Sequence, residues 1–351
     1  MAHYILKRLL LMIPTLFGVL LITFAVTQFV PGGPVEQLVH QLQHGGREGG
    51  EASVGAEGMY RGAQGLDEER LAEIRAFYGF DKPAHERFLA MLGNYLTFDL
   101  GESYFQHQDV LALMASKLPV SISLGMWTFL LTYLISIPLG VRKAVRDGTP
   151  FDVWTTTLLL VGYAIPGFVL GLFLLVLFGG GSFWDVFPLR GLVSDHWDEL
   201  SWPARIGDYL WHMVLPVTAM VVGNFAVMTL LTKNSFLEEI RKQYVLTARA
   251  KGLSENQVLY GHVFRNAVIP LVTGFPAAFI GAFFTGSLLI ETLFSLDGLG
   301  LLSYEAVLQR DYPVVLGTLY IYTLLGLVAK LLTDLSYAWV DPRIQFGAVE
   351  R

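Results

Sequence analysis

Residues 233–270 read KNSFLEEIRKQYVLTARAKGLSENQVLYGHVFRNAVIP, and the interpretation of the whole chain starts from this segment. It is a long polar segment between two apolar runs that are each long enough to cross a membrane. Three acidic residues, Glu238, Glu239 and Glu255, accompany six basic ones: Lys233, Arg241, Lys242, Arg249, Lys251 and Arg265. The segment is therefore a net basic connection between two predicted membrane helices.

The pattern of the segment predicts two short helices joined at Gly252. Apolar residues recur three or four positions apart, which places them on one helix face: Leu237, Ile240, Tyr244 and Ala248. Glycine commonly follows a helix end because it adopts a left-handed backbone without steric cost. Ser254 and Gln257 have the spacing of a capping box and predict the start of a second helix. The expected apolar face of that helix is Val258, Leu259, His262 and Val263.

Three interpretations fit such a segment: an ordinary structured loop, a DNA-reading helix-turn-helix and a docking element for a soluble partner. Its helix–glycine–helix order has the shape of a helix-turn-helix. Attachment to membrane helices at both ends and a net charge of +3 argue against phosphate binding, so we expect no nucleic-acid partner.

The segment resembles the cytoplasmic EAA loop of ABC-importer permeases, in the form found in dipeptide and oligopeptide importers. The match lies in TARAKGLS (247–254) and HVFRNAVIP (262–270), while Leu246 and Thr247 replace the usual Glu-Ala and Arg265 stands where other importer classes have proline. The resemblance implies coupling to an ATPase through Thr247, Ala248, Arg249, Ala250, Lys251, Gly252, Leu253, Ser254, His262, Arg265 and Asn266.

Composition predicts an integral membrane protein. Of the 351 residues, 53% are hydrophobic and only 15% are charged, which leaves too little charge to cover a soluble domain of this size. The chain contains no cysteine, so disulfides, thiolate catalysis and cysteine-based metal sites are excluded.

Six apolar runs predict an all-α polytopic fold with six transmembrane helices, because runs of about 20 apolar residues span a bilayer as helices. The first, within residues 1–30, lacks the short core and cleavage site of a signal peptide, so we expect it to be retained. The other five spans are predicted at 119–141, 153–178, 212–232, 268–293 and 314–340. Together they form a core at 119–340, and a tail follows at 341–351.

Residues 31–118 predict a small acidic helical domain outside the membrane, with thirteen acidic residues against seven basic ones. Its insert at 40–65 has eight glycines and too little apolar content to form a core. Asp67 is expected to begin one helix, and a second is expected at 84–96. The resemblance to peptide permeases continues in YGFDKPAHERF (78–88) and FDLGESY (98–104).

Loop charges predict the orientation. With the N-terminus inside, the inner segments carry 13 Lys/Arg and the two short outer loops carry 3. Since basic residues favour the cytoplasmic side, we expect both termini and residues 233–267 in the cytoplasm and residues 31–118 in the periplasm.

Three ionisable residues fall inside the predicted spans, where charge is costly and commonly functional: Glu291, Lys330 and Asp334. Lys330 and Asp334 are four residues apart, so we expect them to pair on one helix face. Glu291 belongs to LLIETLFSLDGLGLLSYEAVLQRDYPVVLG (288–317), which is similar to a block in peptide permeases, many of which have proline in place of Asp297.

No motif predicts catalysis. The chain has no G-x-x-x-x-G-K-[ST] phosphate loop, no H-E-x-x-H and no G-x-S-x-G, and its histidines have no metal-binding spacing. We therefore expect no catalytic, cofactor or metal site on this chain. The resemblance implies that ATP and Mg²⁺ bind to a partner ATPase.

The resemblance covers nearly the whole chain and implies a type I ABC-importer permease in the bacterial inner membrane. Within the family the chain is similar to Yej-type permeases, which take up oligopeptides and the peptide–nucleotide antibiotic microcin C; the shared segments are PGGPVEQ (31–37), FPLRGLVS (187–194), LTKNSF (231–236) and the glycine-rich insert. The implied partners are a second homologous permease, ABC ATPase subunits, a periplasmic peptide-binding protein, the peptide and membrane lipid. The alternatives are a membrane receptor or assembly subunit, and a channel that opens without ATP.

The orientation can be tested with single cysteines in this cysteine-free chain. An impermeant thiol reagent added to intact spheroplasts should label Ser53→Cys and spare Ser254→Cys, because the first residue is expected outside and the second inside. Permeabilised cells are the control, in which both variants should be labelled. The reverse pattern in intact spheroplasts would refute the predicted orientation.

Overall fold

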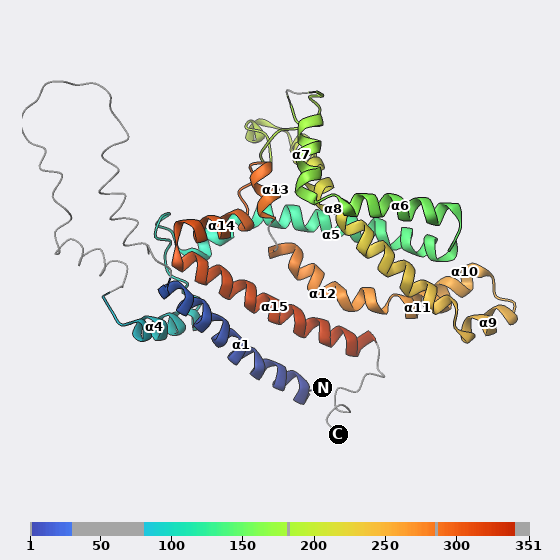
Figure 1. Ribbon diagram of the computed structural model, residues 1–351, viewed down its shortest axis with the longest axis horizontal. Helices are drawn as coiled ribbons and strands as arrows, with labels where there is room; N and C mark the ends of the chain where they lie inside the picture. Colours follow the sequence, from blue (N-terminus) through green and yellow to red (C-terminus); the bar gives the residue numbers. More distant parts are fainter. Residues whose placement is uncertain (1, 30–80, 181–182, 285–286, 341–351) are drawn as a thin grey trace, which may run out of the picture. The chain divides into compact units, whose positions relative to one another are not determined.

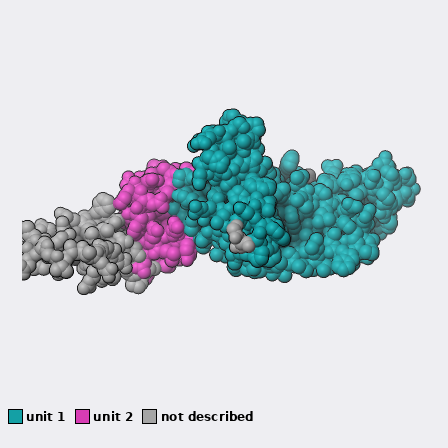
Figure 2. Space-filling view, turned by 90° about the horizontal axis from the view of Figure 1, so that it is seen from above, with its two compact units in different colours: residues 1–10, 116–302, 324–351 teal, residues 11–115, 303–323 magenta. Residues whose placement is uncertain are grey.

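The computed structural model describes residues 2–29, 81–180, 183–284 and 287–340. Within these ranges the protein is built from helices and contains no strand; one isolated β-bridge joins Glu102 to Asp109. The chain divides into two compact units (Figure 2). Unit 1 comprises residues 1–10, 116–302 and 324–351, and unit 2 comprises residues 11–115 and 303–323.

Among the described residues, four helices are long and apolar enough to cross a membrane (Figure 1): α1 (Ala2–Phe29), α5 (Val110–Val145), α8 (Trp202–Ile240) and α15 (Tyr312–Val340). The predicted spans at 1–30 and 314–340 agree closely with α1 and α15. The spans predicted at 119–141 and 212–232 lie within α5 and α8, which extend further at both ends. With 39 residues, α8 is about 58 Å long, so it continues well beyond a 30 Å hydrocarbon layer.

The predicted span at 153–178 is interrupted, because two helices occupy it. Helix α6 (Pro150–Ala164) and helix α7 (Gly167–Phe178) meet at an angle of 91°. Proline lacks the backbone N–H that a helix needs, and it restricts the residue before it to extended conformations. Ile165, which precedes Pro166, has such a conformation, with φ −87° and ψ 118°.

The predicted span at 268–293 is also divided. Helix α12 (Ile269–Phe284) is bent by 52° from the helical segment before it, and α13 (Leu288–Leu293) is a separate short helix. By length and composition the described residues contain four candidate spans, or as many as six if each bent pair crosses the membrane once.

Unit 2 contains most of the described portion of the predicted outer domain, residues 81–115. The helix expected at 84–96 is confirmed as α4 (Ala84–Leu96). Its Phe88 ring packs against Phe24 of α1, and Tyr95 packs against Tyr320 of α15, with ring centroids 5.2 and 5.0 Å apart. The glycine-rich insert and the helix expected at Asp67 lie outside the described residues.

Further polar contacts hold unit 2 together around α14 (Leu299–Gln309) and α15. The Ser103 hydroxyl donates to a carboxylate oxygen of Asp311 over 2.5 Å, and the Tyr104 N–H donates to the other oxygen over 3.1 Å. Both Ser103 and Asp311 are buried. The FDLGESY segment noted in the sequence is therefore attached by hydrogen bonds to the residue before α15.

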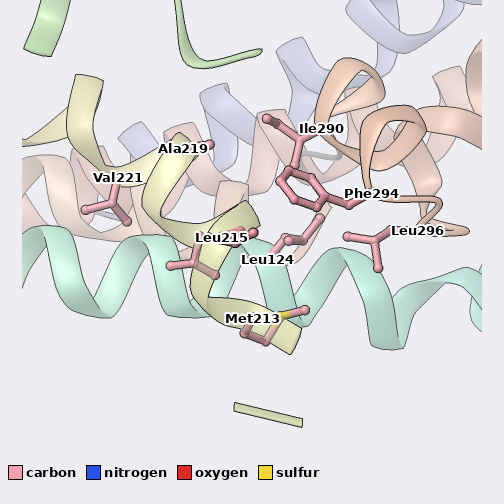
Figure 3. Close-up of a cluster of buried hydrophobic side chains, with 9 residues drawn as sticks. Leu124, Met213, Leu215, Ala219, Val221, Ile290, Phe294 and Leu296 are labelled. Carbon is pink, nitrogen blue, oxygen red and sulfur yellow. The ribbon is translucent and has the colours of Figure 1, made fainter. Parts of the chain in front are cut away.

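An apolar core joins three elements of unit 1 (Figure 3). Leu124 of α5 meets the middle of α8 and the residues in and after α13, all with exposed fractions below 6%: Met213, Leu215, Val217, Ala219, Val221, Ile290, Phe294 and Leu296. Within a membrane such a core is stabilised mainly by van der Waals packing between the helices.

Two glycines let helices of unit 1 approach closely. A Cβ at Gly125 of α5 would lie 1.7 Å from the carbonyl oxygen of Ala282 in α12, and one at Gly140 would lie 2.5 Å from Cβ of Thr232 in α8. Contacts this short cannot form without a backbone shift, so these positions on α5 require glycine.

Substitution of Gly125 should therefore destabilise unit 1. Gly125→Ala should lower the free energy of unfolding by at least the 1–3 kcal/mol typical of overpacking, because the opposing atom is backbone. Gly274→Ala on α12 is the matched control, since a Cβ there meets nothing within 4 Å. Thermal unfolding in detergent micelles would measure both changes, and equal melting temperatures would contradict the close α5–α12 approach.

Candidate functional site

Residues 233–267, called here the coupling segment, contain all eleven residues predicted to contact an ATPase. The segment includes the end of α8, then α9 (Gln243–Ala250), α10 (Glu255–Val258), a π-helical turn (Leu259–Val263) and α11 (Phe264–Ala267). The predicted joint is confirmed, since Gly252 has a left-handed backbone with φ +81°. The predicted capping box between Ser254 and Gln257 is also confirmed.

The first helix predicted in the segment is two helices in the structure rather than one. Leu237 and Ile240 belong to α8, whereas Tyr244 and Ala248 belong to α9. Lys242, between them, has an extended backbone with φ −76° and ψ 153°, which ends one helix and begins the next. The four apolar residues nevertheless share one core.

That core gives the coupling segment a fixed shape. Its central residues are buried, with exposed fractions of 6% or less, and come from five helices and the π-turn: Val141, Ala144, Phe236, Val245, Ala248, Val258, Val263 and Ala267. Val141 and Ala144 belong to the C-terminal end of α5. The coupling segment is thus packed onto α5 and is a rigid body rather than a slack loop.

The π-turn explains an error in the predicted face of the second helix. A π-turn bonds residues five apart, so Val258 and Val263 both face the core. His262, which a regular helix would place on that face, is exposed. Leu259 is half-buried.

Hydrogen bonds connect the helices on the two sides of Gly252 and on the two sides of Lys242. The Arg249 guanidinium donates two hydrogen bonds of 2.9 Å to the Glu255 carboxylate, across Gly252. This bond from Arg249 lowers the pKa of the Glu255 carboxyl. The Tyr244 hydroxyl donates to Glu239 over 2.7 Å and accepts from the Asn266 amide over 3.2 Å, so it connects α8, α9 and α11.

The solvent face of the segment carries most of the predicted residues. Ala248 is buried and Leu253 is half-buried, while the others are exposed: Thr247, Arg249, Ala250, Lys251, Gly252, Ser254, His262, Arg265 and Asn266. Leu246 and Tyr260 add apolar surface, with 59% and 62% of their area exposed. Sequence reasoning noted Leu246 only as a departure from a motif and missed Tyr260.

A buried ion cluster at the base of the segment was also missed. The Lys143 ammonium has no exposed surface and donates to the Asp152 carbonyl and to the Thr155 and Thr156 hydroxyls, over 2.7–2.8 Å. It lies 3.0 Å from one Asp152 carboxylate oxygen, and Lys233 donates to the other over 2.7 Å. Sequence analysis treated both lysines only as basic residues of inner loops, because no pattern near them in the sequence indicates that they pair with Asp152.

Glu291 is buried, and it lies in the short helix α13 rather than in a long span. Its carboxylate accepts the backbone N–H groups of Ser287, over 3.0 Å, and Leu301, over 2.7 Å. Leu301 is in the first turn of α14, where free N–H groups favour an anion. Glu291 therefore fixes the turn between α13 and α14.

The predicted pair between Lys330 and Asp334 is wrong. Asp334 instead accepts from the Arg8 guanidinium over 2.8 Å and from the Tyr4 hydroxyl over 2.9 Å. Lys330 is exposed, and in the part of the chain that the structure describes no ion pair joins it to Asp334. Sequence spacing could not show this, because α1 and α15 lie far apart in the chain.

These features define a multi-pass helical membrane protein with a packed segment that exposes a mostly polar face. Residues 136–346 match the family described as binding-protein-dependent transport system inner membrane component. The chain belongs to this family and is a permease of the peptide ABC-transporter class, located in the inner membrane.

Similarity to individual relatives extends over the full length. The chain is 57% identical to the peptidoglycan transport system permease protein YejB of Agrobacterium fabrum and 55% identical to the inner membrane ABC transporter permease protein YejB of Escherichia coli O157:H7. It is 32% identical to the dipeptide transport system permease protein DppB of Escherichia coli K12. Each alignment covers 98% or more of both proteins.

The buried ion cluster should contribute strongly to stability. Asp152→Asn removes the carboxylate between two ammonium groups and should cost about 3–5 kcal/mol, as when one partner of a buried pair is removed. Asp147→Asn removes a half-exposed partner of Lys233 and should cost about 1 kcal/mol or less. Melting temperatures of the two variants in detergent would test this order, and a larger effect at Asp147 would contradict it.

Proposed function

We propose that this chain is one of two homologous permease subunits of an ATP-driven, binding-protein-dependent importer of oligopeptides. The observation that carries the proposal is the coupling segment, a body with its own core that presents a mostly polar face with two apolar side chains. ABC ATPase subunits dock on this face. Membership of the family supports these partners, since its description names binding-protein-dependent transport.

The proposed topology has six spans in a type I importer arrangement, with both termini and the coupling segment in the cytoplasm. Residues 31–118 form the periplasmic domain and help to seat the peptide-binding protein. The asymmetry of basic residues, 13 on the inner segments against 3 on the short outer loops, supports this orientation.

ATP and Mg²⁺ bind to the partner ATPases in this proposal. The sequence supports it, because no phosphate-binding loop is present in the 351 residues. This chain is then a transport subunit rather than an enzyme, and hydrolysis takes place on the neighbouring subunit.

The proposed mechanism is alternating access, and the way the coupling segment is packed supports it. Its core includes Val141 and Ala144 of α5, and at its first residue Lys233 pairs with Asp152 of α6. Closure of the ATPase dimer moves the segment, and these contacts carry the motion to α5, α6 and α8. A loop without a core would absorb the motion instead.

Peptides are the proposed cargo. Relatives are named for dipeptide, oligopeptide and peptidoglycan transport, and these cargoes share peptide bonds. We extend the range to peptide–nucleotide antibiotics such as microcin C, on the basis of the similarity to Yej-type permeases. Peptidoglycan fragments are a second cargo class, favoured by the name of one relative that is 57% identical.

The alternatives are a membrane receptor or assembly subunit, and a channel that opens without ATP. Uptake of a labelled tripeptide into vesicles separates them. An importer requires the co-reconstituted ATPase and ATP, a channel requires neither, and a receptor gives no uptake.

Gly252→Val should uncouple the permease from its ATPase. Valine at φ +81° costs about 1–2 kcal/mol locally and displaces α10 relative to α9. Stimulation of ATP hydrolysis by loaded binding protein, and peptide uptake, should both fall in reconstituted vesicles. Ser254→Ala should act in the same direction more mildly, because loss of an N-cap costs about 1 kcal/mol.

Gly261→Ala is the matched control for Gly252→Val. Gly261 is exposed in the same segment, a Cβ there meets nothing within 4 Å, and its φ is not positive. Its stimulation should equal that of the unmodified chain. Normal stimulation in Gly252→Val, with the complex intact, would place coupling elsewhere.

A further inference from the structure

Lys330 is a charged residue of α15 to which the proposed function gives no role. It lies ten residues before the end of α15 at Val340, which is about 15 Å from that end along the helix. Its side chain is exposed, and among the residues that the structure describes no carboxylate or other acceptor pairs with its ammonium group. A charge within a membrane helix is costly without a partner, so we expect a partner outside the described residues.

The carboxylate closest to Lys330 along α15 is already neutralised. Asp334 follows Lys330 by one helical turn, and one of its oxygens accepts from the Arg8 guanidinium over 2.8 Å and from the Tyr4 hydroxyl over 2.9 Å. The N-terminal end of α1 therefore lies against the C-terminal end of α15 (Figure 1). Two cations and one carboxylate meet there, so Lys330, Arg8 and Asp334 together carry a net charge of +1.

Lys330 belongs to an exposed face of α15. Gly326, four residues before it, and Tyr337, seven residues after it, are also exposed, and these spacings place the three residues on one side of a helix. A Cβ at Gly326 would meet nothing within 4 Å, so the surface there is open. Lys330 therefore has open surface on one side along the helix and a tyrosine on the other.

The surface of α1 around Arg8 is apolar. Leu6, Leu9 and Leu10 have 45–56% of their area exposed. The Arg8 side chain remains 34% exposed although it pairs with Asp334. A ligand that matches this surface combines an anionic group with apolar chains. A phospholipid has both, whereas a small soluble anion has no group for the leucines.

The position of Lys330 along α15 suits a phosphate at the boundary of the hydrocarbon layer. Tyr337 and Trp339 are 39% and 83% exposed, and both are residue types that favour the membrane interface. Lys330 precedes Tyr337 by seven residues, which is about 10 Å along the helix. A lysine stem stays in the apolar layer while its ammonium group extends toward the interface, so the ammonium comes within reach of a headgroup.

We propose that the paired ends of α1 and α15 bind an anionic phospholipid, with the Lys330 ammonium and the Arg8 guanidinium on its phosphate. Both groups are charged donors, and charge-assisted hydrogen bonds to phosphate are stronger than neutral ones. The acyl chains lie on the open surface at Gly326 and on the exposed leucines of α1. Asp334 holds Arg8 at this turn of α15. The site goes beyond the proposed function and does not rest on it.

A second permease subunit is the rival occupant of this face. To pair with Lys330 it would have to place an Asp or Glu within one of its own membrane helices, where carboxylates are rare. Anionic lipid presents its phosphate at the membrane boundary without that requirement, so it is the better match. The two occupants differ in whether lipid still binds once the complex has assembled.

The first test measures lipid binding by native mass spectrometry. Phosphatidylglycerol and phosphatidylcholine are added in equal amounts to the delipidated full chain and to the assembled complex, both in detergent. Phosphatidylglycerol should bind about fivefold more than phosphatidylcholine, because basic residues near the membrane surface attract anionic headgroups. In Lys330→Gln this ratio should fall several-fold, whereas Lys330→Arg, which keeps the charge, should retain it.

Lys82→Gln is the matched control, since it removes an exposed lysine of unit 2. Its binding ratio should equal that of the unmodified chain. Equal binding of the two lipids by the unmodified complex, or an unchanged ratio in Lys330→Gln, would overturn the proposal. A preference in the chain alone that disappears in the complex would assign the face to the second permease and overturn it too. Displacement by excess inorganic phosphate would assign the site to a soluble anion instead, with the same consequence.

The second test uses stability, because a ligand that binds only the folded state raises the melting temperature. Phosphatidylglycerol should raise the melting temperature of the unmodified chain more than phosphatidylcholine does. Lys330→Gln should lose this difference and Lys82→Gln should keep it. The same difference in all three proteins would overturn the assignment of Lys330. Neither test measures transport, so absence of ATP-dependent uptake would refute the proposed function and leave this site standing.

Discussion

The burial of Lys143 is the constraint on which unit 1 depends. Burial of an ammonium group is costly unless oxygen acceptors satisfy its N–H donors and a negative charge balances its own. Here Asp152, Thr155 and Thr156 supply the oxygens, and Asp152 also supplies the charge. Because these partners belong to α6 and Lys143 to α5, the two helices must keep one relative position. Lys233 adds α8 through the second Asp152 oxygen. The coupling segment begins at this fixed point.

Helix α5 takes part in two different packing contacts along its length. Toward its C-terminal end, Val141 and Ala144 enter the core of the coupling segment, so the segment is a continuation of the helix bundle rather than an attachment to it. Toward the middle, glycine and alanine bring α5 and α12 together. In the proposed mechanism, a motion imposed on the segment therefore acts on the same helix that approaches α12.

Several features followed from local sequence because their causes are local. The length of apolar runs predicted α1 and α15, and Gly252 with the Ser254 capping box predicted the joint in the coupling segment. Other local signals were misread. The predicted span at 153–178 did not show that Pro166 divides α6 from α7, and the π-turn shifted His262 to the surface.

The sequence alone therefore determined the class of protein, the helical content and the local shape of the coupling segment, since composition and short-range spacing control these. Tertiary structure decided which charges meet. Asp334 pairs with Arg8 rather than with Lys330, and Lys233 with an aspartate 81 residues away, because helices distant in sequence pack side by side. It also decided that α5 and α12 approach at Gly125, which no local pattern indicates.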